Sequence, residues 1–144
     1  MQVRDVFGAQ GRDVAVLGPD ALVSEAADIM DERRIGTVVI CSDSGRVIGV
    51  ISERDIIAAV AEGAGDFSSM EVSRLFSEDP VVCSPDDKAE KVSETMRERH
   101  FRHMPVVEHG KLVGIVSLGD ILAHTLRERG LDELANYWTK LDFL

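Results

Sequence analysis

The chain has 144 residues, of which 44% are hydrophobic and 29% are charged, a balance typical of a globular protein rather than a disordered one. Its formal net charge of −10 argues against a general affinity for nucleic acid, because phosphate backbones are bound by clustered Lys and Arg. No apolar run is long enough to cross a membrane, and the N-terminal stretch holds scattered charges instead of a signal peptide. Cys41 and Cys83 lie in apolar runs, as free core cysteines do, so the predicted location is the cytoplasm.

The first half of the chain predicts a strand, a helix, two strands and a second helix. The apolar residues of the first helix share one face, and a turn-like Ser42-Asp43-Ser44-Gly45 separates the two later strands. In chain order the elements are a strand at Val14–Leu17, a helix through Val23, Ala26, Ala27 and Met30, strands at Thr37–Cys41 and Val47–Ile51, and a helix from Asp55 to about Glu62. A segment of small and polar residues, Gly63–Ser69, then predicts a flexible connector.

The second half repeats the first. The run Gly49–Ile56 returns as Gly114–Ile121, while Val3–Val6 is loosely echoed by Val72–Leu75. Ser84 is a predicted N-cap, with Pro85 at the first helical position. The expected elements are a strand at Val81–Cys83, a helix through Ala89, Val92 and Met96, strands at Met104–Val107 and Leu112–Val116, and a helix from Asp120 to about Arg129.

The predicted fold class is α/β, of the α+β kind, with two β-α-β-β-α repeats packed sheet to sheet about a pseudo-twofold axis. One copy alone is too small to bury both faces of its sheet. The expected divisions are 1–69 for the first repeat with its connector, 70–129 for the second repeat and 130–144 for a C-terminal helix. That last helix, with Trp138 on its apolar face, either folds back on its own domain or forms a subunit contact.

The two strand-to-helix junctions, Ser52-Glu53-Arg54-Asp55 and Ser117-Leu118-Gly119-Asp120, admit two compatible interpretations. Ser-x-x-Asp caps a helix, and a Ser N-cap contributes about 1 kcal/mol. The same helix start is also an anion site, because unpaired amides and the positive end of the helix dipole face outward there. Arg54 is either a phosphate clamp or a solvated arginine in a charged turn.

With this layout the sequence resembles a tandem CBS-domain protein, a module also called a Bateman domain. Gly49–Ile56, Gly114–Ile121, Ile35–Ile40 and Phe101–Val107 carry the resemblance, which spans about Met1 to Arg129. It implies an adenosine-containing ligand (AMP, ADP, ATP, NAD or S-adenosylmethionine) in clefts between the two repeats. The residues expected to contact the ligand are Ala15, Ile35, Gly36, Thr37, Ser52, Arg54 and Asp55 in the first repeat, and Arg102, His103, Ser117 and Asp120 in the second.

The resemblance implies that the Ser and Asp of each junction hold phosphate or ribose, and that the basic pair Arg102-His103 faces the phosphates. His103 is otherwise a half-buried, hydrogen-bonded histidine at the start of a strand. Because Gly36-Thr37 stands where the second repeat has Arg102-His103, the two clefts are expected to differ in affinity.

The expected function is therefore that of a regulatory module that senses an adenosine nucleotide and signals by changing shape or assembly. The alternative is a structural oligomerisation module without bound nucleotide. No nucleophile motif or phosphate-cradling glycine loop indicates an enzyme, and no His or Cys set indicates a metal or a catalytic cofactor. A homodimer and an effector protein that the sequence does not identify are the expected protein partners.

Overall fold

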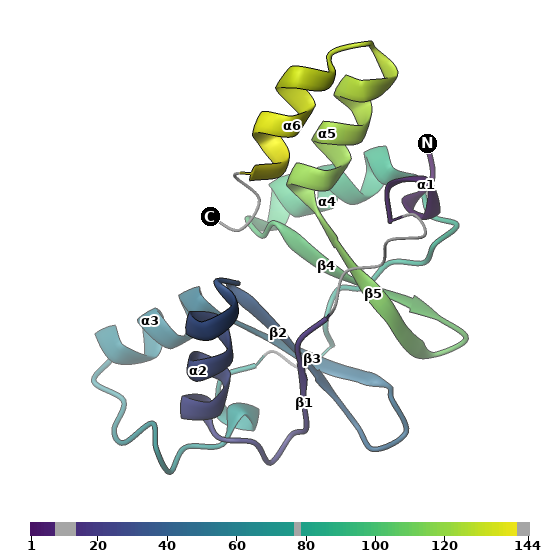
Figure 1. Cartoon of the computed structure of the whole chain (residues 1–144). Helices are drawn as coiled ribbons and strands as arrows, with labels where there is room; N and C mark the ends of the chain where they lie inside the picture. Colours follow the sequence, from purple (N-terminus) through teal and green to yellow (C-terminus); the bar gives the residue numbers. More distant parts are fainter. Residues whose placement is uncertain (8–13, 77–78, 141–144) are drawn as a thin grey trace. The chain divides into compact units, whose positions relative to one another are not determined.

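The computed structural model describes residues 1–7, 14–76 and 79–140, with only the backbone described for Thr139 and Lys140 (Figure 1). The chain divides into two compact units, one formed by residues 14–80 and the other by residues 1–13 together with 81–144. Six α-helices and two small sheets within the described ranges make it a mixed α and β protein, as predicted.

The first unit contains a three-stranded sheet with order β1-β2-β3. β1 (Val16–Leu17) pairs parallel with β2 (Thr37–Cys41), which pairs antiparallel with β3 (Val47–Ser52). Helix α2 (Val23–Arg33) connects β1 to β2, and α3 (Glu53–Ala61) follows β3 directly. Apolar residues of α2, β2 and β3 form the core, among them the fully buried Val23, Val38 and Ile51.

The second unit repeats this order with a smaller sheet. β4 (His103–Glu108) pairs antiparallel with β5 (Lys111–Ser117), between α4 (Ala89–Arg99) and α5 (Leu118–Glu128). The strand predicted at Val81–Cys83 reduces to a single parallel bridge between Cys83 and Val106. Its core gathers buried residues of α4, α5 and the sheet, including Met96, Met104 and Val116.

Each unit is completed by a short segment that the sequence assigns to the other repeat. Helix α1 (Val3–Phe7) belongs to the second unit, where the Val3 amide donates to the Asp87 carbonyl at 2.9 Å. The 3₁₀ turn η1 (Val72–Arg74) belongs to the first unit, where the Val72 amide donates to the Ala21 carbonyl at 2.8 Å. Val3 and Val72, which the sequence comparison had aligned, are both fully buried. The ranges 1–69 and 70–129 thus describe sequence repeats and 130–144 the tail, and as domain boundaries all three stay a prediction.

The predicted N-cap at Ser84 is wrong. α4 begins at Ala89, and Ser84 instead closes a turn in which its amide donates to Asp87 Oδ2 at 2.8 Å and its Oγ accepts from the Asp86 amide at 3.2 Å. The helix cannot start earlier because Lys88 is held extended by an antiparallel bridge to Gln2. The first repeat behaves in the same way, with Leu22 bridged to Glu71 before α2 begins.

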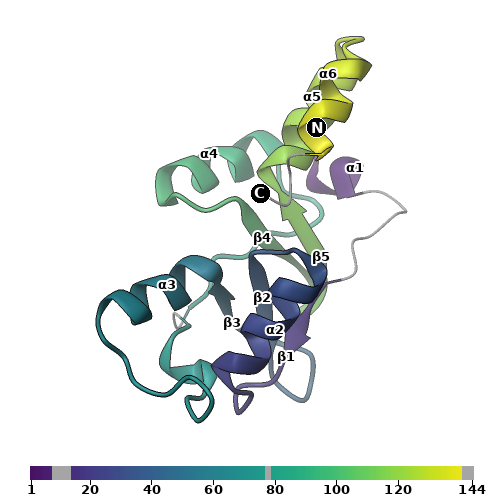
Figure 2. The same ribbon diagram turned by 60° about the vertical axis from the view of Figure 1, so that its left-hand side comes forward.

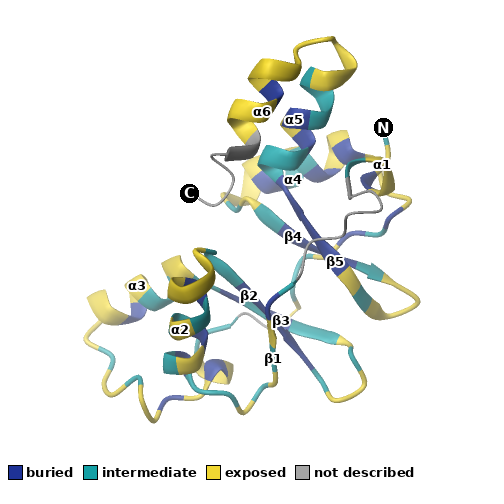
Figure 3. Ribbon diagram, in the orientation of Figure 1, coloured by how far each residue is buried: buried dark blue, intermediate teal, exposed yellow. Residues whose placement is uncertain are grey.

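The connector predicted to be flexible is anchored at Phe67, which packs against the first core and whose carbonyl accepts from the Ser24 amide at 3.3 Å. At the other end of the chain, α6 (Asp132–Lys140) lies along α5 after a turn at Gly130, and both views show the two helices side by side (Figure 2). Ala135 is fully buried, whereas Leu134 and Trp138 are exposed. Figure 3 shows α6 coloured mostly as exposed. The helix therefore folds back on its own unit; residues 141–144 of the predicted C-terminal helix lie outside the described residues.

No helix in the described ranges is both long enough and apolar enough to cross a membrane.

Candidate functional site

At the first strand-to-helix junction, Ser52 ends β3 and caps α3. Its Oγ accepts from the Asp55 amide at 3.2 Å, while Asp55 Oδ2 accepts from the Ser52 amide at 2.8 Å and from the Ser52 hydroxyl at 3.0 Å. This is a complete capping box, so the capping interpretation is confirmed here. The helix starts at Glu53, two residues earlier than predicted, because Asp55 is the third helical residue rather than the first.

The second junction also begins its helix with a serine cap. Ser117 ends β5 and caps α5, and its Oγ accepts from the Asp120 amide at 2.9 Å. Ser117 is fully buried, whereas Ser52 is half-buried. In both units the end of the strand supplies a Ser and the first turn of the helix supplies an Asp, at the positive end of a helix dipole, where an anion or a polar ligand group is favoured.

The residues beside each junction come from the strand paired with it. Thr37 lies opposite Ser52 in the sheet register, and His103 lies opposite Ser117. The carbonyl of Gly36 accepts from the Glu53 amide at 2.9 Å, and the carbonyl of Arg102 accepts from the Leu118 amide at 2.8 Å. The structure thus brings four of the predicted residues together in each unit: Gly36, Thr37, Ser52 and Asp55 in the first, and Arg102, His103, Ser117 and Asp120 in the second.

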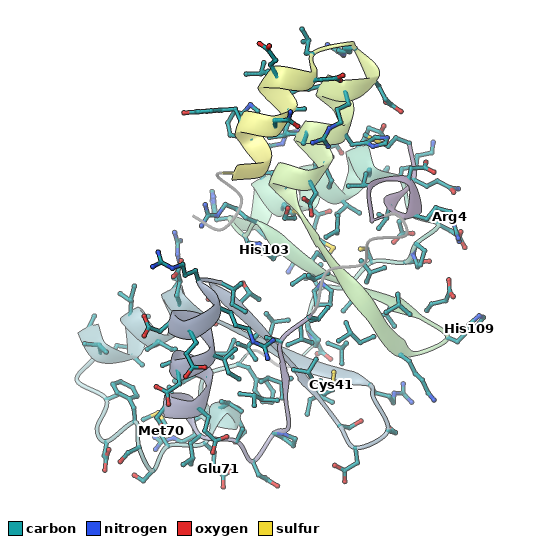
Figure 4. All side chains as sticks on the ribbon, viewed as in Figure 1. Arg4, Cys41, Met70, Glu71, His103 and His109 are labelled. Atoms are coloured by element: carbon teal, nitrogen blue, oxygen red, sulfur yellow. The ribbon has the colours of Figure 1, made fainter. Side chains whose placement is uncertain are left out.

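A left-handed turn at the end of the preceding helix sets up each of these approaches. Arg34 and His100 have φ values of 53° and 60°. The backbone amide of the residue after each donates a hydrogen bond to the carbonyl of Met30 or Met96. This C-terminal cap stops the helix and turns the chain into the strand. Figure 4 labels His103 at the start of β4, directly after that turn. Arg102 is exposed and His103 half-buried.

The remaining predicted residues lie further from the junction atoms. Ile35 packs against the first core, and Ala15 is buried with its carbonyl accepting from the Val39 amide at 2.9 Å. That bond places Ala15 along the edge of β2 opposite to β3. Arg54 is an exposed residue in the first turn of α3.

The sequence reasoning missed the contact of Glu53 with Gly36. A Cβ built on Gly36 would lie 3.0 Å from Glu53 Oε1, so the Glu53 carboxylate lies directly beside the glycine. A first-turn acidic residue is expected at any helix start, and for this reason its spacing gave no signal of a contact with the neighbouring strand.

The two thiols are unsuited to nucleophilic or ligating roles. Burial raises the pKa of Cys83 to about 12 and also raises the pKa of Cys41. Both cysteines are free and remain protonated at neutral pH. Within the described part of the chain, no group of three or more His, Cys, Asp or Glu residues is placed to hold a metal ion.

Comparison with known proteins gives the same two repeats. The family model described as "CBS domain" matches residues 3–62 and 72–127. An uncharacterised 17.7 kDa protein of Acidianus ambivalens is 34% identical over 109 residues, which cover 75% of this chain. The chain spans 65% of that relative's own length, slightly less than two thirds.

Solved structures of similar chains have the same fold. A CBS-domain protein of Agrobacterium tumefaciens matches with a TM-score of 0.79 and 35% identity, over 87% of this chain and 99% of that one. A CBS-domain protein of Pyrobaculum aerophilum, solved in complex with AMP, matches with a TM-score of 0.74 and 28% identity, over 83% of this chain and 89% of that one.

Proposed function

The chain belongs to the CBS-domain family, and we propose that it is a regulatory module that binds an adenosine-containing nucleotide at its strand-to-helix junctions. The observation that carries the proposal is the paired Ser and Asp at the start of α3 and again at the start of α5. The complex of the Pyrobaculum relative with AMP supports the ligand class. The family is generally regulatory, so the proposed role is sensing rather than catalysis.

The second junction offers the richer surroundings for a phosphorylated ligand. An ionised Asp accepts hydrogen bonds only, which suits the paired hydroxyls of a ribose, and Asp120 fills this role. Arg102 directly precedes β4, the strand whose first residue lies opposite Ser117. Its guanidinium provides the planar donor set that phosphate oxygens prefer. His103 adds a ring nitrogen beside Ser117. We expect this junction to bind AMP or ATP more tightly than the first.

Binding is proposed to act by shifting an existing equilibrium of shape or assembly. A ligand shifts such an equilibrium only by its difference in affinity for the two states. The output then passes to an effector protein, whose identity stays open. The proposed ligands are AMP, ADP, ATP, NAD and S-adenosylmethionine.

The test is a thermal-shift panel with these ligands and NADH, followed by calorimetry on those that raise the melting temperature. A ligand that binds only the native state raises it by mass action. Asp120→Asn keeps one acceptor oxygen and replaces the other by a donor, and it should weaken AMP binding by roughly ten- to a hundredfold. Asp132→Asn, in the first turn of the distant α6, is the matched control. Unchanged affinity in Asp120→Asn and Asp55→Asn alike would remove the site assignment.

Arg102→Ala separates phosphate binding from structure. It should weaken AMP binding and reduce the salt dependence of that binding. Because Arg102 is exposed, the interactions of its side chain in the empty protein should be worth no more than about 1 kcal/mol, so the melting temperature without ligand should fall only slightly. A large loss of stability without ligand would make Arg102 a structural residue instead.

The second candidate function is structural oligomerisation, and exposed apolar side chains favour it. Ile57 and Val60 of α3 are 67% and 59% exposed, and Leu134 and Trp138 of α6 are 47% and 40% exposed. Such faces are common at subunit contacts, so a homodimer is proposed under both functions. Sedimentation at micromolar concentration should show a dimer, and a monomer of 15.8 kDa would refute it. A dimer that no adenosine ligand stabilises would support the structural alternative.

A further inference from the structure

The two junctions share one backbone framework but differ in charge at one place. Gly36 and Arg102 occupy equivalent positions, since the carbonyl of each accepts from the first amide of the following helix, that of Glu53 or of Leu118. The register repeats as well, with Thr37 opposite Ser52 and His103 opposite Ser117. Side-chain differences at the matched pairs Gly36/Arg102 and Glu53/Leu118 are therefore differences at the same site.

In the first junction an acid stands where the second has a base. The Glu53 Oε1 and Cδ atoms lie 3.0 and 3.1 Å from the point that a Gly36 Cβ would occupy, which is where the side chain of Arg102 begins in the second repeat. Leu118, the counterpart of Glu53, packs against the second core and carries no charge. The first junction thus places a carboxylate, and the second a guanidinium stem, next to the same strand-to-helix turn.

From this reversal we infer that Glu53 is a specificity residue of the first junction, selecting adenosine ligands with a neutral or cationic 5′ substituent over phosphorylated ones. This inference rests on the proposed function. A phosphate monoester carries about −1.5 to −2 charges at neutral pH, so it is repelled by a carboxylate at contact range. A ribose is unaffected, because Asp55 and Ser52 remain in place for its hydroxyls. A sulfonium cation is attracted.

Arg54, adjacent to Glu53 in the chain, is the group that opposes this selection. It is exposed in the first turn of α3, where a guanidinium offsets a neighbouring carboxylate for any phosphate that reaches both. The position of the Glu53 carboxylate beside Gly36 favours the acid, because it places the negative charge next to the turn itself. The two residues can be separated by single substitutions that do not alter the capping box of Ser52 and Asp55.

The experiment isolates the first junction in an Asp120→Asn background and measures three probes by calorimetry: adenosine, AMP and S-adenosylmethionine. Glu53→Gln should raise AMP affinity about five- to twentyfold, lower S-adenosylmethionine affinity several-fold, and change adenosine affinity less than twofold. The gain for AMP should shrink at high salt, because Glu53 is exposed. Glu62→Gln, at the opposite end of α3, is the matched charge control and should change none of the three.

Two results overturn the inference while leaving the proposed function intact. In one, adenosine binds but Glu53→Gln leaves AMP affinity unchanged, whether or not Arg54→Ala abolishes it. In the other, Glu62→Gln raises AMP affinity as much as Glu53→Gln does. If none of the three probes binds the parent chain or any variant, the inference and the proposed function are both overturned.

Discussion

Gly49→Ala tests why the repeated junction run begins with a glycine. Gly49 is buried on β3, and a Cβ added there would lie 2.2, 2.6 and 2.8 Å from three ring atoms of Phe76. Ordinary van der Waals contact starts near 3.4 Å, so ring or strand must move by about 1.2 Å, the difference between 3.4 and 2.2 Å. Phe76 follows η1 and packs, half-buried, against the first core, so a movement of its ring disturbs that packing.

The expected cost of Gly49→Ala is about 1–3 kcal/mol of unfolding free energy, the usual range for overpacking. For a chain of this size that corresponds to a fall in Tm of roughly 3–10 °C. Urea unfolding followed by circular dichroism measures it. Gly65→Ala is the matched control, since nothing lies within 4 Å of its added Cβ and its cost should be within about 0.5 kcal/mol of zero.

A double-mutant cycle decides whether Phe76 is the cause. In a Phe76→Ala background the ring is gone, so Gly49→Ala should cost at least about 1 kcal/mol less than in the parent chain. An equal cost in the two backgrounds would refute the steric explanation. The requirement for glycine would then come from the backbone of β3 and not from the Phe76 ring.

Three further predictions follow from the described contacts. Ser52→Ala and Ser117→Ala each remove the side-chain acceptor of a helix amide, so each should lower the free energy of unfolding by about 1 kcal/mol without ligand, as measured in urea. Val3→Ala should lower the free energy of unfolding by about 2 kcal/mol, although Val3 lies near the start of the chain, because its side chain is fully buried in the second core. Arg4→Ala is the control and should show no comparable loss, because the ion pair of Arg4 with Asp86 is exposed. Burial raises the pKa of Cys83 to about 12, so between about pH 9 and 12 the unfolded chain has lost a thiol proton that the native protein keeps. The free energy of unfolding should therefore fall as pH rises through this window, and Cys83→Ala should lessen that fall.

The sequence predicted the elements that depend on local patterns. The strands Thr37–Cys41 and Val47–Ile51 and the capping residues Ser52 and Ser117 follow from apolar runs and from Ser-x-x-Asp spacing, which are short-range signals. The start of α4 was misplaced because the pattern at Ser84-Pro85 is a valid cap in isolation. Its true start depends on the bridge from Lys88 to Gln2, a residue far away in the sequence.

The same limit applies to the site. The junction residues were predictable because each lies within a repeated run, and their match to a family supplied the ligand class. The contact of Glu53 with Gly36 was not predictable, since it joins the start of α3 to the residue before β2 and depends on the missing side chain of the glycine. Whether any of the predicted residues contacts a ligand, Ala15 and Ile35 included, stays a prediction.

The exchange of α1 and η1 between the repeats determines how far each repeat can act alone. The chain passes from one unit to the other twice, between residues 7 and 14 and between residues 76 and 81. A fragment that ends at residue 69 therefore lacks Met70 and Val72, two buried members of the first core, although it contains every predicted ligand residue of that repeat. Likewise, a fragment starting at residue 70 lacks Val3, which is fully buried in the second core. Each junction is thus held by a core that needs residues from the sequence of the other repeat, so the two junctions are stabilised as parts of one continuous chain even though their side chains at Gly36 and Arg102 differ in charge.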